Sequence, residues 1–208
     1  MLKEHGQKTV DGRWRSTAAE KNAGVIWDTL KPYLPEAGLV TEIASGTGQH
    51  IAQFAALSPR LQWQPTEPDP DLRISIKKNI QLSGLQNIAQ PISVNVLSDS
   101  DVLPDAKLIV NINMLHVSQP SAMSGLFRCV YRSLEKEGYF FLYGPFIHGG
   151  VFNSDGNKSF HSALVEINPG WGLREINAVI TEAIRQHFEL VAKIDMPANN
   201  TSLIFRKV

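Results

Sequence analysis

Residues 39–55 constrain the fold more than any other segment, because a short apolar run passes through a glycine turn into a helical apolar pattern. The run Leu39–Ala44 predicts a buried strand, and the apolar spacing after the turn predicts a helix. Gly46 and Gly48 lack side chains where the backbone must turn tightly or approach a ligand. Ile51 stands three residues beyond Gly48, so the dinucleotide pattern G-x-G-x-x-G is incomplete. The segment therefore predicts an α/β domain with a nucleotide-like ligand that lacks a pyrophosphate.

Two acidic residues indicate the charge of that ligand. Glu42 lies in the first predicted strand, where it favours a cation and disfavours a phosphate. Glu67 follows the second predicted strand, 61–66, and lies 19 residues after Gly48, near the offset at which a carboxylate accepts hydrogen bonds from ribose hydroxyls. S-adenosylmethionine carries a sulfonium cation and a ribose, so we expect it as the cofactor and S-adenosylhomocysteine as its product. A nicotinamide-dependent oxidoreductase is the less favoured alternative.

Composition excludes several other classes of function. The 208 residues suit a polar segment, 1–15, followed by a single domain, 16–208. Lys plus Arg and Asp plus Glu each total 20, and the basic residues are scattered, so we expect no nucleic-acid partner. The single cysteine, Cys129, and the lack of a long apolar run favour a cytoplasmic protein without a membrane segment. No spacing of histidines suggests a bound metal.

Strands and helices alternate along most of the chain. Thr17 with Glu20 has the spacing of a capping box at the start of a first helix, and Asp69, Pro70 and Gly84 delimit another. Residues 144–171 lack periodicity and predict a long irregular loop before a helix that begins near Leu173. The remaining strands are expected at 92–96, 106–113, 139–143, 188–194 and 201–206, the last two as a hairpin.

This order of elements resembles the class I S-adenosylmethionine-dependent methyltransferases. The resemblance implies a Rossmann-like seven-stranded sheet, order 3-2-1-4-5-7-6 with strand seven antiparallel, and helices on both faces. Six blocks are also similar to the methyltransferase-like 26 family: 42–50, 63–65, 113–118, 143–145, 168–174 and 196–200. The resemblance implies transfer of a methyl group but names no acceptor.

The class I resemblance also implies a set of cofactor-binding residues. Near the end of the third predicted strand, Asn95 offers an amide oxygen to the adenine amino group, and Asp99 is a competing candidate. The full set of expected cofactor contacts is Glu42, Ala44, Gly46, Gly48, Glu67, Asn95, Asn113 and Met114.

His116, which follows the fourth predicted strand, is the candidate general base, with His148 as the runner-up. A purely structural role for His116 is an equal alternative. The carboxyl ends of parallel strands gather ligands, so we expect Tyr143, His148, Asn199 and Asn200 to line the acceptor pocket. The acceptor is expected to be a small molecule, with a protein side chain as the alternative. A non-catalytic cofactor-binding or scaffolding protein of the same fold remains open.

Overall fold

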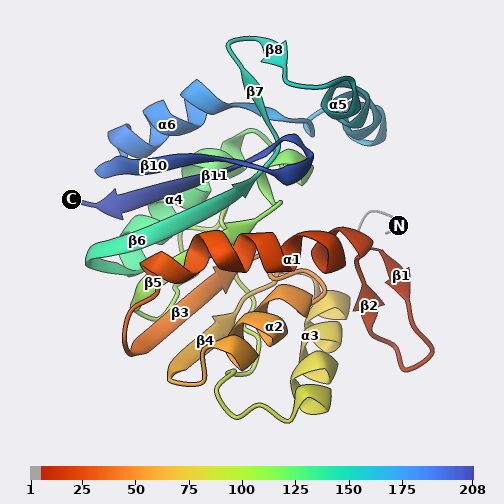
Figure 1. Cartoon of the computed structure of the whole chain (residues 1–208), viewed down its shortest axis with the longest axis vertical. Helices are drawn as coiled ribbons and strands as arrows, with labels where there is room; N and C mark the ends of the chain where they lie inside the picture. The colour runs from red at the N-terminus through yellow and green to blue at the C-terminus, as the bar shows by residue number, and fades with distance from the viewer. Residues whose placement is uncertain (1–5) are drawn as a thin grey trace. The chain divides into compact units, whose positions relative to one another are not determined.

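The computed structural model describes residues 6–208 and has a central six-stranded sheet in the order β10-β11-β6-β5-β3-β4 (Figure 1). β3 and β4 are parallel, whereas β11 is antiparallel to both β6 and β10. The chain forms two compact units: the first runs to Asn95 and includes 105–110, and the second contains 96–104 and 111–208. The sheet strands are β3 (Gly38–Ile43), β4 (Leu61–Pro65), β5 (Ala106–Ile112), β6 (Leu134–Gly144), β10 (Phe188–Met196) and β11 (Asn200–Lys207).

The predicted order of seven strands is not confirmed, because the described residues form no strand at 92–96 and the central sheet has six strands. Only two isolated parallel bridges follow the edge of β4, Trp63 with Ile88 and Thr66 with Ile92. Pro65 and Pro91 lie between these bridges, and neither can donate a backbone hydrogen bond to a ladder. The pairing is therefore interrupted before a strand forms. The expected antiparallel strand near the C-terminus is present as β11.

In the first unit, α1 (Thr17–Leu30), α2 (Gln49–Leu57) and α3 (Pro70–Ser83) accompany β3 and β4. Ser16, rather than Thr17, caps α1, because its hydroxyl accepts from the amide of Ala19 at 3.3 Å. Asp69 and Gly84 delimit α3 as predicted, and a short 3-10 turn, η1 (Lys31–Tyr33), follows α1.

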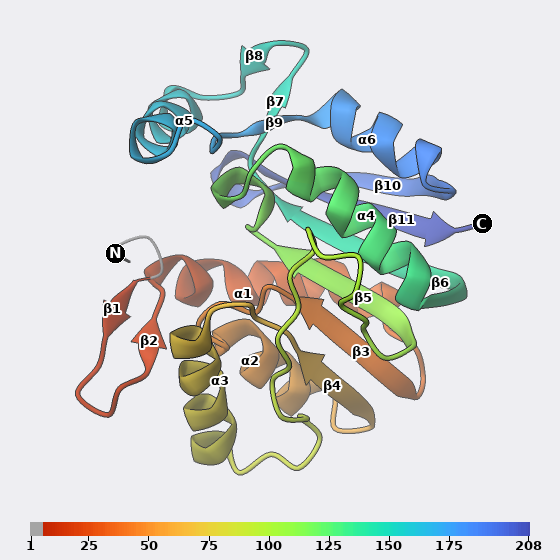
Figure 2. The ribbon, with the colours of Figure 1, turned by 180° about the vertical axis from the view of Figure 1, so that it is seen from behind.

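A small hairpin, β1 (Gln7–Lys8) and β2 (Trp14–Arg15), precedes α1 within the segment for which the sequence predicts no element. It lies beside α3 in both ribbon views (Figure 2). Residues 1–5 of the predicted polar segment lie outside the described residues.

In the second unit, α4 (Ser121–Ser133) and α6 (Ile176–Arg185) accompany β6, β10 and β11. The core contains a cluster of aromatic rings, in which Phe127 makes edge-to-face contacts with Phe140 and Phe205 at 5.5 Å. The predicted terminal hairpin is confirmed, with β10 and β11 joined by η3 (Pro197–Asn199).

The prediction of an irregular loop over 144–171 is wrong, because this segment contains β7 (Phe146–His148), β8 (Val151–Phe152) and α5 (Asp155–Ile167). β7 pairs with both β8 and β9 (Arg174–Glu175) in a separate small sheet. The helical spacing of Phe160, Leu164 and Ile167 is a short signal for α5, of which only Asn157 and Leu164 are buried. Its start is set by the hydroxyl of Ser154, which accepts from the amide of Asn157 at 3.1 Å.

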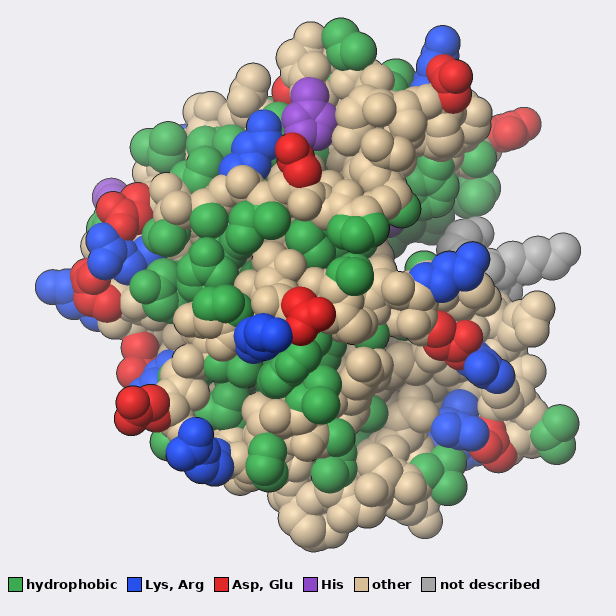
Figure 3. Space-filling model, viewed as in Figure 1, with side chains coloured by type: hydrophobic (Ala, Val, Ile, Leu, Met, Phe, Trp, Pro, Cys, Tyr) green, Lys and Arg blue, Asp and Glu red, His purple; other side chains and the backbone are tan. Residues whose placement is uncertain are grey.

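The surface shows no concentration of one charge on the face seen in Figure 3, where Lys and Arg side chains are interspersed with Asp and Glu. The helices within residues 6–208 include none with the length and apolar content needed to cross a membrane.

Candidate functional site

The turn after β3 in the first unit, 44–48, has three residues in the left-handed region. These are Ala44 with φ 56°, Gly46 with φ 55° and Gly48 with φ 82°. A Cβ on Gly48 would lie 3.0 Å from the Cα of Ile76, so this glycine permits α2 and α3 to pack closely. A Cβ on Gly46 would meet no described atom within 4 Å. The two glycines therefore have different roles, and Gly46 is the one beside open space.

Glu67 fixes this turn from the end of β4. Its Oε2 accepts from the amide of Gly46 at 2.9 Å, and its Oε1 accepts from the amide of Asp69 at 3.1 Å. Burial raises the pKa of Glu67, although the two amide hydrogen bonds and Arg73 oppose that shift. Each carboxylate oxygen retains acceptor capacity, so Glu67 can hold the turn and still accept from ligand hydroxyls.

Glu42, at 2 % exposure, is even more deeply buried, and its Oε2 has no hydrogen-bond partner among the described residues. Burial raises the pKa of Glu42 to about 8, and the nearby charge of Glu67 adds to the effect while Ser45 opposes it. An unpaired buried carboxyl oxygen is costly unless a donor or a cation meets it. The turn thus combines open space at Gly46 with a buried carboxyl oxygen, Glu42 Oε2, that has no partner among the described residues.

The two candidates for adenine recognition are both exposed. Asn95 is the last residue of the first unit's main segment and lies in an irregular stretch rather than at a strand end. Asp99 belongs to the second unit, where its carboxylate lies 3.6 Å from the guanidinium of Arg128.

In the second unit, a turn follows β5 and leads into the short 3-10 turn η2 (Leu115–Val117). Asn113 has φ 60°, and its amide donates to the carbonyl of Tyr143 at 2.9 Å. Met114 is half-buried, whereas His116 is 7 % exposed and packs edge-on against the Phe160 ring at 5.3 Å. Burial lowers the pKa of His116 to about 4, with a further contribution from the charge of Arg174. The His116 ring is consequently neutral at pH 7.

Arg174 fixes the position of this turn. Its guanidinium donates to the carbonyls of Leu115 at 3.2 Å, Gly170 at 3.0 Å and Ser118. The carbonyl of His116 also accepts from the amide of Gly172 at 2.9 Å. Arg174 therefore binds backbone carbonyls rather than a carboxylate, and the segment before β9 holds η2.

Gly144 lies beside His116 and is paired with Thr201, and neither is among the predicted site residues. A Cβ on Gly144 would lie 3.6 Å from Asn113 Oδ1 and 3.7 Å from His116 Nδ1. Thr201 is paired directly with Gly144 in the β11–β6 register, so its side chain points to the same face of the sheet. Its hydroxyl is buried without a partner among the described residues. The sequence contains no signal that marks Thr201 as a site residue, since threonine is an ordinary strand residue.

The residues predicted to line the acceptor pocket do not share one environment. Tyr143 is buried at 2 % exposure and, as the neighbour of Gly144 in the same strand, points to the opposite face. His148 lies in β7, and its Nε2 is buried without a partner in the described part of the chain. The carbonyl of Asn199 accepts from two side-chain amides, and the Asn200 amide donates to carbonyls of its own turn at 3.2 and 3.4 Å.

Residues 6–208 contain no group of three or more His, Cys, Asp and Glu side chains arranged to hold a metal ion.

Comparisons with known proteins agree with this fold. The family model described as "Protein of unknown function (DUF938)" matches residues 13–207. An O-methyltransferase family protein from Burkholderia thailandensis is similar with a TM-score of 0.78 and 14 % identity, over 91 % of this chain and 56 % of that one. An O-methyltransferase family 2 protein from Planctomyces limnophilus, in complex with apigenin, gives a TM-score of 0.75 and 13 % identity, over 92 % and 60 %.

Human N-acetylserotonin methyltransferase, solved with S-adenosylmethionine, gives a TM-score of 0.75 and 15 % identity, over 91 % of this chain and 52 % of that chain. The chain therefore spans between half and three fifths of the length of these three structures. At identities this low the comparison shows the fold alone, an α/β fold that this chain shares with these three methyltransferase structures.

Proposed function

We propose that this chain, which belongs to the DUF938 family, is a class I methyltransferase that uses S-adenosylmethionine to methylate a small molecule. The observation that carries the proposal is the unpaired, buried carboxyl oxygen of Glu42 in the strand that enters the Gly46 turn. A ligand with a cationic ammonium group would compensate that oxygen. Within class I, we assign the chain to the methyltransferase-like 26 family on the six similar sequence blocks alone.

The residues of the first unit fit this cofactor. Glu42 supplies an anionic partner for the ammonium group, and Glu67 has acceptor capacity left for the ribose hydroxyls. The cofactor, when bound, supplies a methyl group activated by the sulfonium. The complex of human N-acetylserotonin methyltransferase with S-adenosylmethionine supports the choice. Ala44 and Gly48 shape the turn, and the proposed further contacts are Asn95, with Asp99 as its alternative, Asn113 and Met114.

His116 is the proposed catalytic residue. Its neutral ring can accept the proton of an acceptor hydroxyl at Nδ1 while the acceptor oxygen forms its bond to the methyl carbon and the carbon–sulfur bond breaks. Because its pKa of about 4 makes it a weak base, His116 orients the hydroxyl and takes the proton only as the acceptor oxygen becomes positively charged. Thr201 and Asn113 offer the acceptor further hydrogen bonds. The apigenin complex of the Planctomyces protein supports a small hydroxylated acceptor.

The first experiment is calorimetric titration with S-adenosylmethionine, S-adenosylhomocysteine and NADH. We expect the first two to bind and NADH not to bind. A carboxyl group with a pKa of about 8 is protonated at pH 7, so binding of an ammonium group to Glu42 should release roughly one proton per ligand. The comparison of buffers with different ionisation enthalpies measures this release.

Glu42→Gln should abolish the proton release and weaken binding, whereas the exposed Glu36→Gln should change neither. Binding of NADH alone, or of no ligand, would overturn the proposal. Tight binding with no turnover of any hydroxylated acceptor would indicate a non-catalytic cofactor-binding protein instead.

His116→Asn should lower turnover at least about 100-fold, the usual scale of a lost general base, and leave the affinity for S-adenosylhomocysteine unchanged. His187→Asn is the matched control, because His187 is exposed and has φ 62°, which asparagine tolerates. Equal turnover of both variants would reduce His116 to a structural residue.

A further inference from the structure

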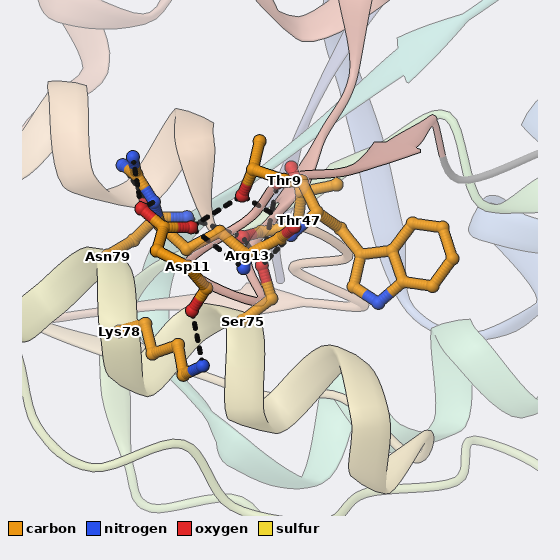
Figure 4. Close-up of polar contacts among 8 residues, drawn as sticks. Thr9, Asp11, Arg13, Thr47, Ser75, Lys78 and Asn79 are labelled. Atoms are coloured by element: carbon orange, nitrogen blue, oxygen red, sulfur yellow. Dashed lines mark hydrogen bonds and ion pairs between the residues drawn. The ribbon is translucent and has the colours of Figure 1, made fainter.

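The N-terminal hairpin, residues 7–15, is connected to the Gly46 turn through the side chains of α3 (Figure 4). The contacts converge on Thr47, the residue between the two glycines. The carbonyl of Thr47 accepts from Ser75 Oγ at 3.0 Å and from Asn79 Nδ2 at 2.8 Å. Ser75 and Asn79 are four residues apart, so they lie on the same face of α3.

Both α3 side chains are themselves bonded to the hairpin. The amide of Trp14 donates to Ser75 Oγ at 2.8 Å, and Arg13 Nη1 donates to Asn79 Oδ1 at 3.3 Å. A serine hydroxyl has one proton, and the Thr47 carbonyl at 3.0 Å is a nearer acceptor than the Trp14 carbonyl at 3.5 Å. Two chains of hydrogen bonds therefore run in the same direction, from Trp14 through Ser75 and from Arg13 through Asn79, to the Thr47 carbonyl.

A third connection reaches Thr47 from the residue that follows the hairpin. Gln49 Oε1 accepts from the amide of Ser16 at 2.5 Å and from the hydroxyl of Thr47 at 2.9 Å. The backbone and the side chain of Thr47 are thus both held by groups whose other partner lies in residues 13–16. Since the Thr47 carbonyl belongs to the peptide plane of Gly48, these bonds fix the orientation of the turn.

The hairpin has little to stabilise it apart from these contacts. Its strands are two residues long, Val10 at its tip is fully exposed, and short two-stranded hairpins are marginally stable in water. Within the hairpin, Asp11 organises the turn by accepting from Thr9 Oγ1 at 2.5 Å and from the amide of Arg13 at 3.2 Å. Lys78 Nζ adds one bond to the Asp11 carbonyl at 2.5 Å.

We propose that Ser75 and Asn79 are positioning residues, through which docking of the hairpin on α3 sets the geometry of the Gly46 turn and hence its affinity for the cofactor. This inference rests on the proposed function for the identity of the ligand. The coupling is reciprocal, because whatever ligand selects the ordered turn must also stabilise the docked hairpin. Residues 7–15 are thereby part of the cofactor site without contributing a ligand contact.

The decisive variant is Asp11→Ala, which loosens the hairpin and removes the ion pair between Asp11 and Arg13 at 2.9 Å, while every residue of the three connections to Thr47 stays in place. We expect it to weaken binding of S-adenosylhomocysteine by about two- to tenfold, the range for one lost net hydrogen bond. Asp28→Ala is the matched control, since Asp28 at the end of α1 forms an ion pair with Lys31 of η1, as Asp11 does with Arg13, and its loss should leave affinity unchanged. Ser75→Ala should weaken binding by a similar factor, and Ser83→Ala on the same helix should not.

Amide hydrogen exchange provides a readout that does not need the ligand. In Asp11→Ala, exchange should accelerate at Trp14 and at Gly48 together, and in the wild type S-adenosylhomocysteine should slow exchange at Trp14. Faster exchange at Trp14 with unchanged exchange at Gly48 and unchanged affinity would overturn the inference. If the wild type binds no S-adenosylhomocysteine, the proposed function fails, and the exchange at Gly48 still decides whether the hairpin orders the turn.

Discussion

The turn after β3 and the turn after β5 share a backbone conformation but are held by different hydrogen bonds. Each begins with a non-glycine residue in the left-handed region, Ala44 with φ 56° and Asn113 with φ 60°. The first turn is held by polar side chains that surround it, including Glu67, which accepts from the Gly46 amide. The second is held mainly by one arginine, Arg174, whose bonds reach the Leu115, Ser118 and Gly170 carbonyls.

This difference separates the chemistry of the two turns. Around the first, two buried carboxyl groups, Glu42 and Glu67, favour a cation. Around the second, the Arg174 charge lowers the pKa of His116 beyond what burial does, so cations and protons are disfavoured. A charged ligand group is therefore expected at the first turn and a neutral hydroxyl at the second.

The largest expected effect comes from the buried histidine at each turn, His50 in α2 and His116 in η2. Burial lowers the pKa of both to about 4. The folded state holds both rings neutral while the unfolded state takes up protons below about pH 6.5, so the stability that the two rings contribute is complete above that pH and is lost as pH falls toward 4. Each ring should account for about 3 kcal/mol of this loss.

Urea unfolding between pH 4 and 7 checks this prediction. Relative to the wild type, His50→Asn and His116→Asn should each remove about 3 kcal/mol of the change in stability between pH 6.5 and pH 4. If the dependence of the unfolding free energy on pH is unchanged in His116→Asn but flattened in His50→Asn, only the His50 ring, at the first turn, has a pKa lowered by burial.

Arg174→Ala should have the next largest effect, because it leaves three carbonyls without their donor. We expect a loss of about 2–3 kcal/mol in the free energy of unfolding. Removal of the guanidinium should also raise the pKa of His116, which NMR titration of the ring can measure. Arg128→Ala, which removes a half-buried arginine and its 3.6 Å ion pair with Asp99, should cost less than about 1 kcal/mol. A destabilisation no greater than that of Arg128→Ala would show that the second turn is held by other contacts.

The same comparison explains what could be predicted from the sequence. The first turn follows from local signals, since the glycines, Glu67 and the Asp69 cap of α3 all lie within one β-α-β unit. The support of the second turn could not be predicted, because Arg174 is 59 residues from Leu115 and its partners are backbone carbonyls, which carry no sequence signal. The strands of the hairpin were missed because two residues are too few for a periodic pattern. α5 was missed although Phe160, Leu164 and Ile167 have helical spacing, because Gly, Asn and Ser residues surround that short pattern.

The smallest expected effect tests whether the two left-handed residues carry the same strain. The left-handed region costs alanine about 1–2 kcal/mol relative to glycine in the folded state. The greater flexibility of glycine in the unfolded chain offsets about 0.4–1 kcal/mol of that difference. Ala44→Gly should therefore raise the free energy of unfolding by up to about 1 kcal/mol. Asn113→Gly should give no gain, because asparagine tolerates the conformation.

Ala198, which is exposed and also has φ 56°, is the matched control for Ala44, because its methyl group lies outside the two turns. Equal gains for Ala44→Gly and Ala198→Gly, measured by urea unfolding, would show that the strain at Ala44 is purely backbone. A gain at Ala198 with a loss at Ala44 would mean that the Ala44 methyl group packs against the turn and offsets its strain. In that case the first turn is held by apolar contacts as well as by the polar groups around Thr47, and the contrast with the second turn is sharper than the hydrogen bonds alone suggest.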